Sequence, residues 1–156
     1  MAANRTATAT WNGDLKSGRG RVGGRSSGAF SDLSMSWRSR AEAADGATSP
    51  EELIAAAHAG CFSMALANEL AAKGHTPSVL EVACTVTFDP AALRITRSVL
   101  DVSGDVPGID EASFRQAAEA AKEGCPVSRA LSQDVAVELR ANLTQAGERS
   151  IPPSIH

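Results

Sequence analysis

The feature that most limits how this chain can fold is an apolar run that begins with the signals of a helix start. In SPEE, at residues 49–52, the serine can cap a helix, the proline suits its first position, and the second glutamate completes a capping box. The run stays mostly apolar up to Lys73, and Gly74 is the kind of residue that commonly follows a helix end. We therefore predict one long helix over residues 50–73 and place it in the core.

Short strands are predicted before this helix. The β-branched alternation TATATW over residues 6–11 ends at an Asn-Gly turn signal, and residues 18–22 and 30–37 give two more short strands across a glycine-containing loop. These segments predict a small antiparallel meander. Residues 41–48 are predicted to form a loop that leads into the long helix.

The chain after the long helix predicts a second group of elements. We expect strands over residues 80–88, 93–103 and 135–141, a helix over residues 111–123 capped by Asp110, and a short helix that starts at Cys125-Pro126. This order predicts an α+β fold with one long central helix that carries Cys61. At 156 residues the chain suits a single domain, residues 1–156, whose ends (residues 1–5 and 144–156) are loose.

Composition narrows the class of protein. A formal net charge of −3 gives no general reason to expect nucleic acid or an anionic membrane as partner. The first residues lack the apolar segment of a secretory signal, and the apolar stretch over residues 53–66 is shorter than a membrane span requires. Three cysteines are too few for a secreted disulfide framework, so we expect a cytoplasmic protein with reduced thiols at rest.

The three cysteines occupy different kinds of position. Cys84 alternates with apolar residues on one face of a predicted strand, which is typical of a small core residue. Cys61 lies in the long helix among small residues, which let a substrate or another backbone approach closely. Cys125 occupies the N-cap position before Pro126, where free amides and the helix dipole stabilise a thiolate. Two thiols in such specific places indicate redox chemistry.

His58 lies three residues before Cys61 on the same side of the predicted helix. It can serve as a general base for a Cys–His nucleophile, or as a metal ligand together with Cys61 and Cys125. The third possibility is a histidine packed and hydrogen-bonded in the core. No fourth metal ligand is evident, and these alternatives remain open at the level of the sequence.

Four motifs resemble the OsmC/Ohr family of thiol peroxidases over roughly residues 8–139. They are WNGDLKSGRGRV at residues 11–22, SPEELIAAAHAGCFSMAL at residues 49–66, VPGID at residues 106–110 and GCPVSRAL at residues 124–131. The resemblance implies an OsmC-like fold in an intertwined homodimer with its sites at the subunit interface. It implies no bound cofactor and no metal, and an external dithiol, of the lipoyl type, as reductant.

The same resemblance implies roles for individual residues. Cys61 corresponds to the peroxidatic thiolate that attacks an organic hydroperoxide, and Cys125 to the resolving thiol that forms a disulfide with it. Glu51 matches the family's glutamate at the helix start. Arg40 is the best match for the family's arginine, with Arg38 as the alternative.

Physical chemistry agrees with these implied roles. A guanidinium within about 4–6 Å of a thiol typically lowers its pKa by 1–3 units, enough to make Cys61 mostly thiolate at neutral pH. Glu51 would hold Arg40 through a bidentate ion pair. Ten helical residues span about 15 Å along the axis, so if Glu51 and Cys61 act at one site, we expect Glu51 to come from a partner chain. The alternative is a kink at Gly60 or a bend near Pro50. Two further interpretations are a non-enzymatic redox sensor that uses the same disulfide and a small zinc protein.

Overall fold

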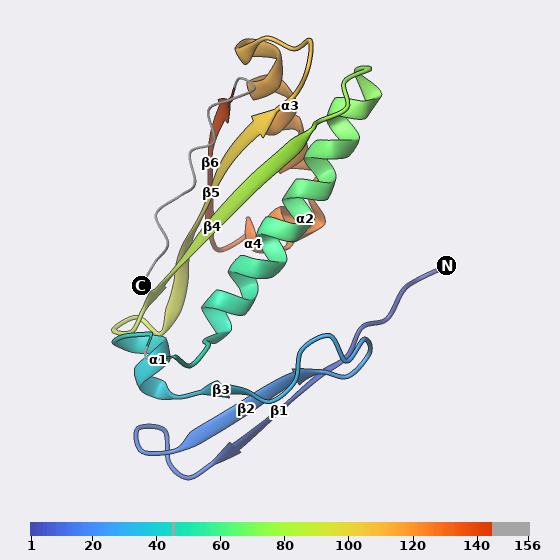
Figure 1. Ribbon diagram of the computed structural model, residues 1–156. Coiled ribbons are helices and arrows are strands. Elements are labelled where there is room, and N and C mark those ends of the chain that lie inside the picture. The colour runs from blue at the N-terminus through green and yellow to red at the C-terminus, as the bar shows by residue number, and fades with distance from the viewer. Residues whose placement is uncertain (45, 145–156) are drawn as a thin grey trace. The chain divides into compact units, whose positions relative to one another are not determined.

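The computed structural model describes residues 1–44 and 46–144 and divides the chain into two compact units (Figure 1). The first unit contains residues 1–54 together with residues 88–95, and the second contains residues 55–87 and the chain from residue 96 onward. The predicted loose tail after Thr144 lies outside the described residues. The mixture of strands and helices confirms the predicted α+β class.

The first unit contains the predicted antiparallel meander. Its sheet has the order β1 (Ala7–Asn12), β2 (Arg19–Gly24) and β3 (Leu33–Met35), with both pairs antiparallel. Trp11 pairs with Gly20, and a β-carbon added at this glycine would lie 2.7 Å from the Cε3 atom of the tryptophan ring. The sheet is therefore built on a close approach that a larger residue would prevent.

A short helix replaces part of the predicted third strand. Residues up to Trp37 were predicted to be extended, but α1 (Trp37–Ala41) begins there. The Ser36 hydroxyl accepts a hydrogen bond from the Ser39 amide, and the Ser39 hydroxyl accepts one from the Ser36 amide, each at 3.0 Å. This reciprocal cap uses serine at the position where glutamate or glutamine is the familiar signal, which is why the strand prediction was wrong here.

The long helix α2 (Pro50–Ala72) begins at the predicted residue and ends one residue early. The Ser49 hydroxyl accepts from the Glu52 amide at 3.1 Å, while the Glu52 carboxylate accepts from the Thr48 hydroxyl. Gly74 follows the helix with a φ of +83°, the left-handed conformation expected after a helix end. By length and composition α2 also satisfies the criterion for a membrane span, although its apolar stretch was predicted to be too short.

The second unit carries a three-stranded sheet of order β4 (Val79–Asp89), β5 (Arg94–Asp105) and β6 (Ala136–Leu143). The four-residue connection makes β4 and β5 an antiparallel hairpin, whereas β5 and β6 are parallel. A parallel pair needs a long crossover connection, and here that connection is formed by α3 (Glu111–Gly124) and α4 (Pro126–Leu131).

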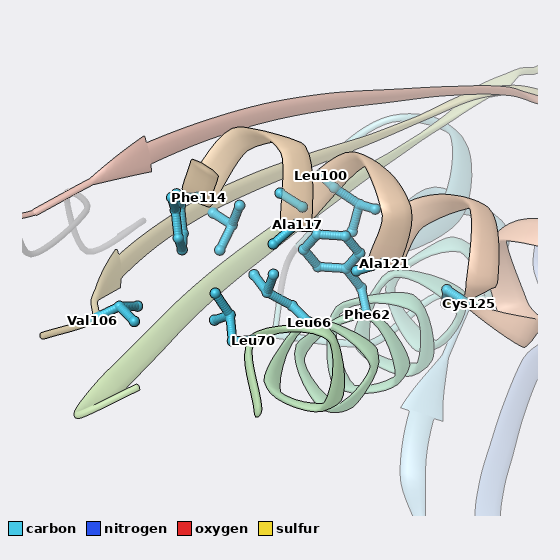
Figure 2. Close-up of a cluster of buried hydrophobic side chains, with 11 residues drawn as sticks. Phe62, Leu66, Leu70, Leu100, Val106, Phe114, Ala117, Ala121 and Cys125 are labelled. Carbon is cyan, nitrogen blue, oxygen red and sulfur yellow. The ribbon is translucent and has the colours of Figure 1, made fainter. Parts of the chain in front are cut away.

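The core of the second unit lies between α2, α3 and the sheet, as Figure 2 shows. The predicted apolar face of α3 is confirmed, and Asp110 caps this helix by accepting from the Ser113 amide at 2.7 Å. Cys125 lies at the end of the core where α3 ends. The buried cluster consists of Phe62, Leu66, Leu70, Leu100, Val102, Val106, Phe114, Ala117, Ala118, Ala121 and Cys125.

Candidate functional site: a thiol pair and an arginine–glutamate pair

The second unit brings Cys61 and Cys125 together. Cys61 lies in the middle of α2 and is partly buried, and Cys125 immediately precedes α4 and is fully buried. Both are free thiols, and each side chain shifts the acidity of the other, so the two lie close together. Residues far apart in the sequence thus lie together as a pair of thiols.

The surroundings of the two thiols shift their acidities in opposite directions. Burial raises the pKa of Cys61, and the neighbouring Cys125 adds to this, while the Val127 amide opposes it. Burial alone would raise the pKa of Cys125, but the amide and hydroxyl of Ser128 and the Cys61 thiol outweigh it and lower that pKa. Within this unit, negative charge on the pair is therefore favoured on Cys125.

His58 is fully buried next to this pair. Its Nδ1 atom lies 2.8 Å from the Ser98 hydroxyl and its Nε2 atom lies 2.8 Å from the Ser128 hydroxyl. Burial lowers the pKa of His58, which keeps the ring neutral. Both ring nitrogens are engaged by hydroxyls, so of the three interpretations the hydrogen-bonded core histidine is confirmed.

Cys84 packs against the core from strand β4, as predicted for a small core residue. Its sulfur also lies 3.3 Å from the Ser98 hydroxyl and 3.8 Å from His58 Nδ1. Burial raises the pKa of Cys84, and the Ser98 hydroxyl opposes this. The sequence carried no signal for these polar contacts, because Ser98 and Cys84 both occupy ordinary strand positions. Among the described residues, no group of three His, Cys, Asp or Glu side chains is placed to hold a metal ion.

The first unit brings Arg40 and Glu51 together. The Nε and Nη2 atoms of Arg40 donate to the same Glu51 oxygen, Oε1, at 3.1 and 2.9 Å. Glu51 is 6% exposed, and its other oxygen, Oε2, is buried without a hydrogen-bond partner among the described residues. Arg38 instead approaches Glu42 at 3.9 Å, and both of those side chains are exposed. The structure therefore pairs Arg40, and not Arg38, with Glu51.

The Phe88 ring also contacts the Arg40 guanidinium. Its Cζ atom lies 4.3 Å from the centre of the Phe88 ring, and Phe88 meets Trp37 edge to face at a centroid distance of 6.3 Å. Such a cation–π contact stabilises the guanidinium and restricts its orientation. Phe88 was predicted only as an apolar strand residue, since this role depends on the position of α1.

Arg40 also lines an open, mainly apolar cleft of about 290 Å³ within the first unit. The four predicted site residues therefore form two pairs, one in each unit. The residues that line the cleft are Trp11, Leu15, Met35, Ser36, Trp37, Arg40 and Pro50.

Comparisons of sequence and of structure with known proteins all match the same group of proteins. The family described as OsmC-like protein matches residues 43–140. Peroxiredoxin OsmC of Escherichia coli is 39% identical over 140 residues, which cover 88% of this chain and 96% of that protein. The organic hydroperoxide resistance protein OhrB of Bacillus subtilis is similar in structure, with a TM-score of 0.65 and 26% identity over 88% of this chain and 98% of its own. An OsmC-like protein from Mycoplasma pneumoniae shares the fold, with a TM-score of 0.70 and 15% identity over 92% of this chain and 99% of its own.

Proposed function

Because the chain belongs to the OsmC family, we propose that it is a cysteine-based peroxidase that reduces organic hydroperoxides to alcohols. The observation that carries the proposal is the contact between Cys61 and Cys125 in one unit. The names of the relatives support it: the Escherichia coli protein is called a peroxiredoxin, and the Bacillus subtilis protein an organic hydroperoxide resistance protein.

In the first step the Cys61 thiolate attacks the terminal oxygen of the hydroperoxide. A sulfur–oxygen bond forms, the oxygen–oxygen bond breaks, and the leaving alkoxide takes up a proton to become the alcohol. Cys61 is thereby oxidised to a sulfenic acid. Because its own unit raises the pKa of Cys61, this thiol needs a nearby cation to ionise at neutral pH. Arg40 is the proposed cation, and Glu51 the carboxylate that holds it.

In the second step the Cys125 thiolate attacks the Cys61 sulfenic acid. A disulfide forms, and the leaving hydroxide takes up a proton to become water. An external dithiol then reduces the disulfide by two thiol exchanges and is itself oxidised to a disulfide. We propose a lipoyl-type dithiol, and no bound cofactor takes part in this scheme.

A homodimer is proposed because the first unit exposes a whole strand and several large apolar side chains. All six residues of β1 are exposed, and large apolar side chains of this unit are also exposed. The helical rise from Glu51 to Cys61 favours Arg40 and Glu51 acting on the Cys61 of a second copy. The proposed setting is the cytoplasm, with no nucleic-acid or membrane partner. The large exposed apolar side chains of this unit are Met1, Trp11, Leu15, Phe30, Leu33 and Leu93.

The apolar cleft beside Arg40 supports an organic substrate. Its walls include Trp11, Leu15 and Met35, which suit an alkyl or aromatic tail better than a small polar molecule. Hydrogen peroxide has no tail to bury and would gain nothing from these side chains. We therefore expect alkyl hydroperoxides to be the better substrates.

The test is consumption of cumene hydroperoxide and of hydrogen peroxide with dihydrolipoamide as reductant, and with thioredoxin in parallel. Fast turnover that prefers the organic peroxide and is lost in Cys61→Ser supports the proposal. Full turnover by Cys61→Ser would overturn it. A single oxidation to the Cys61–Cys125 disulfide with no turnover on any donor would instead favour the redox sensor.

A further inference from the structure

The proposed reaction leaves a group of buried polar side chains without a role. This group, the His58 cluster, consists of His58, Ser98, Ser128 and Cys84. Its two serines and its histidine are at most 3% exposed, and its members come from α2, β5, α4 and β4. Burying so many polar groups is unfavourable unless each finds a partner, and here they find one another.

The contact between His58 and Ser128 lies about one helical turn from the two thiols. His58 lies three residues before Cys61 in α2, and Ser128 lies three residues after Cys125 in α4. The 2.8 Å contact between His58 and Ser128 is therefore a second bridge between the same two helices, next to the two thiols. A second 2.8 Å contact attaches His58 to Ser98 on β5, which restrains the ring from its other side.

Counting donors and acceptors leaves two possible arrangements of the hydrogens between His58 and the two serines. The Ser128 hydroxyl has one proton, and a neutral His58 has one N–H and one acceptor nitrogen. If Nε2 carries the proton, His58 donates to Ser128, the Ser128 proton is free for the Cys125 sulfur, and Ser98 donates to Nδ1. If Nδ1 carries it, His58 donates to Ser98, Ser128 donates to Nε2, and the hydroxyl can then only accept from a protonated Cys125.

We propose that His58 is the positioning residue of the resolving step: with Ser98 and Ser128 it holds α4 against α2 and directs the Ser128 hydroxyl toward the Cys125 sulfur. The Nε2–H form accompanies the thiolate, and the Nδ1–H form accompanies the thiol. The ring nitrogen of His58 that carries the proton therefore depends on whether Cys125 is ionised, although the ring and this sulfur are not in contact. The lowered pKa of Cys125, to which the Ser128 hydroxyl contributes, agrees with this arrangement. The consequence for turnover, but not the hydrogen bonding itself, rests on the proposed function.

The first test measures the acidity of Cys125 directly, without peroxide. In a Cys61→Ser background, the pH dependence of Cys125 alkylation is followed by mass spectrometry. Ser128→Ala is expected to raise the pKa of Cys125 by about one unit, because hydrogen bonds to a charged group are the stronger ones. Ser98→Ala is expected to shift it in the same direction by less, through the His58 ring. Ser132→Ala, at the exposed end of α4, is the matched control and is expected to leave the pKa unchanged.

The second test separates positioning from mere packing. In the otherwise unmodified protein, each dose of organic hydroperoxide gives either the Cys61–Cys125 disulfide or an over-oxidised Cys61 sulfinic acid. Ser128→Ala is expected to increase the sulfinic fraction about tenfold, since fewer Cys125 thiolates are present to attack. His58→Gln, whose amide can still donate to Ser128, should retain more disulfide than His58→Leu.

The third test needs no substitution in the cluster. The NMR signals of the imidazole nitrogens distinguish the two neutral forms of His58. They are expected to exchange roles as Cys125 ionises, and to stop doing so in Cys125→Ser. An unchanged Cys125 pKa in Ser128→Ala, or a His58 form that is the same before and after Cys125 ionises, would overturn the proposal. Absence of peroxide turnover with the predicted pKa shifts intact would count against the proposed function alone.

Discussion

The two halves of the candidate site differ in how completely each is satisfied by its own unit. In the second unit, both nitrogens of His58 meet hydroxyls inside the core, and the buried Cys125 lies beside the partly buried Cys61. In the first unit, Glu51 is buried with one oxygen lacking a partner among the described residues. Its partner Arg40 lines an open cleft, and every residue of strand β1 is exposed. The second unit therefore satisfies its own buried polar groups, whereas the first unit leaves one buried carboxylate oxygen without a partner among the described residues.

The largest change in the free energy of unfolding is expected from a cavity in the core of the second unit. Phe62→Ala removes a fully buried ring from the core and should lower the free energy of unfolding by about 3–5 kcal/mol. The measurement is urea denaturation followed by circular dichroism. Met64→Ala, on the same helix but 70% exposed, is the matched control and should cost little. A large effect of Met64→Ala that depends on protein concentration would mean that a second copy covers this side of α2.

The charged half is expected to respond next. Arg40→Ala leaves the buried Glu51 carboxylate without its cation, which should lower the free energy of unfolding by about 3 kcal/mol, at the low end because Arg40 is one-third exposed. Denaturant unfolding at neutral pH measures it. Adding Glu51→Gln to Arg40→Ala should recover part of the loss, since the uncompensated charge is then gone. A double variant as unstable as Arg40→Ala would show that the ion pair is not the cause.

The second unit should also confer a dependence on pH. Burial lowers the pKa of His58 from its ordinary value of 6.5, so the unfolded chain binds a proton more readily than the folded one. Stability is therefore fully present above pH 6.5 and falls below it, by at most about 1.4 kcal/mol per pH unit. Unfolding measured between neutral and mildly acidic pH should show this slope, and His58→Gln should reduce it. His75→Gln is the matched control, and an equal reduction there would assign the slope elsewhere.

The smallest change in the free energy of unfolding is expected from Arg38→Ala, which distinguishes Arg38 from Arg40 in α1. Arg38 and Glu42 approach at 3.9 Å with both side chains well exposed, so Arg38→Ala should change the free energy of unfolding by less than about 0.5 kcal/mol. It should also leave the pKa of Cys61 unchanged, whereas the proposed function requires Arg40→Ala to raise it. Alkylation of Cys61 as a function of pH measures both. An effect of Arg38→Ala on Cys61 that equals that of Arg40→Ala would remove the distinction between the two residues.

Local patterns predicted those elements whose cause lies within a few residues. The start of α2 follows from the Ser49 cap, the buried face of α3 from the spacing of Phe114 and its alanines, and the Cys125 position from the following proline. The beginning of α1 was missed, because its cap uses two serines, Ser36 and Ser39, in place of a more familiar pair. Side chain–backbone hydrogen bonds and helical periodicity act over one turn, which is why such features can be read along the chain.

Local sequence patterns were therefore enough to predict the α+β class and the long helix, and they singled out Cys61 and Cys125 as candidate site residues. The packing of whole elements set which hydroxyls contact His58, which ring contacts Arg40, and that β5 and β6 pair in parallel. Ser98 and Ser128 are separated from His58 by 40 and 70 residues. No local rule relates residues so far apart. Their meeting depends on how whole elements pack, and burial then makes each hydrogen bond matter because no water can replace it.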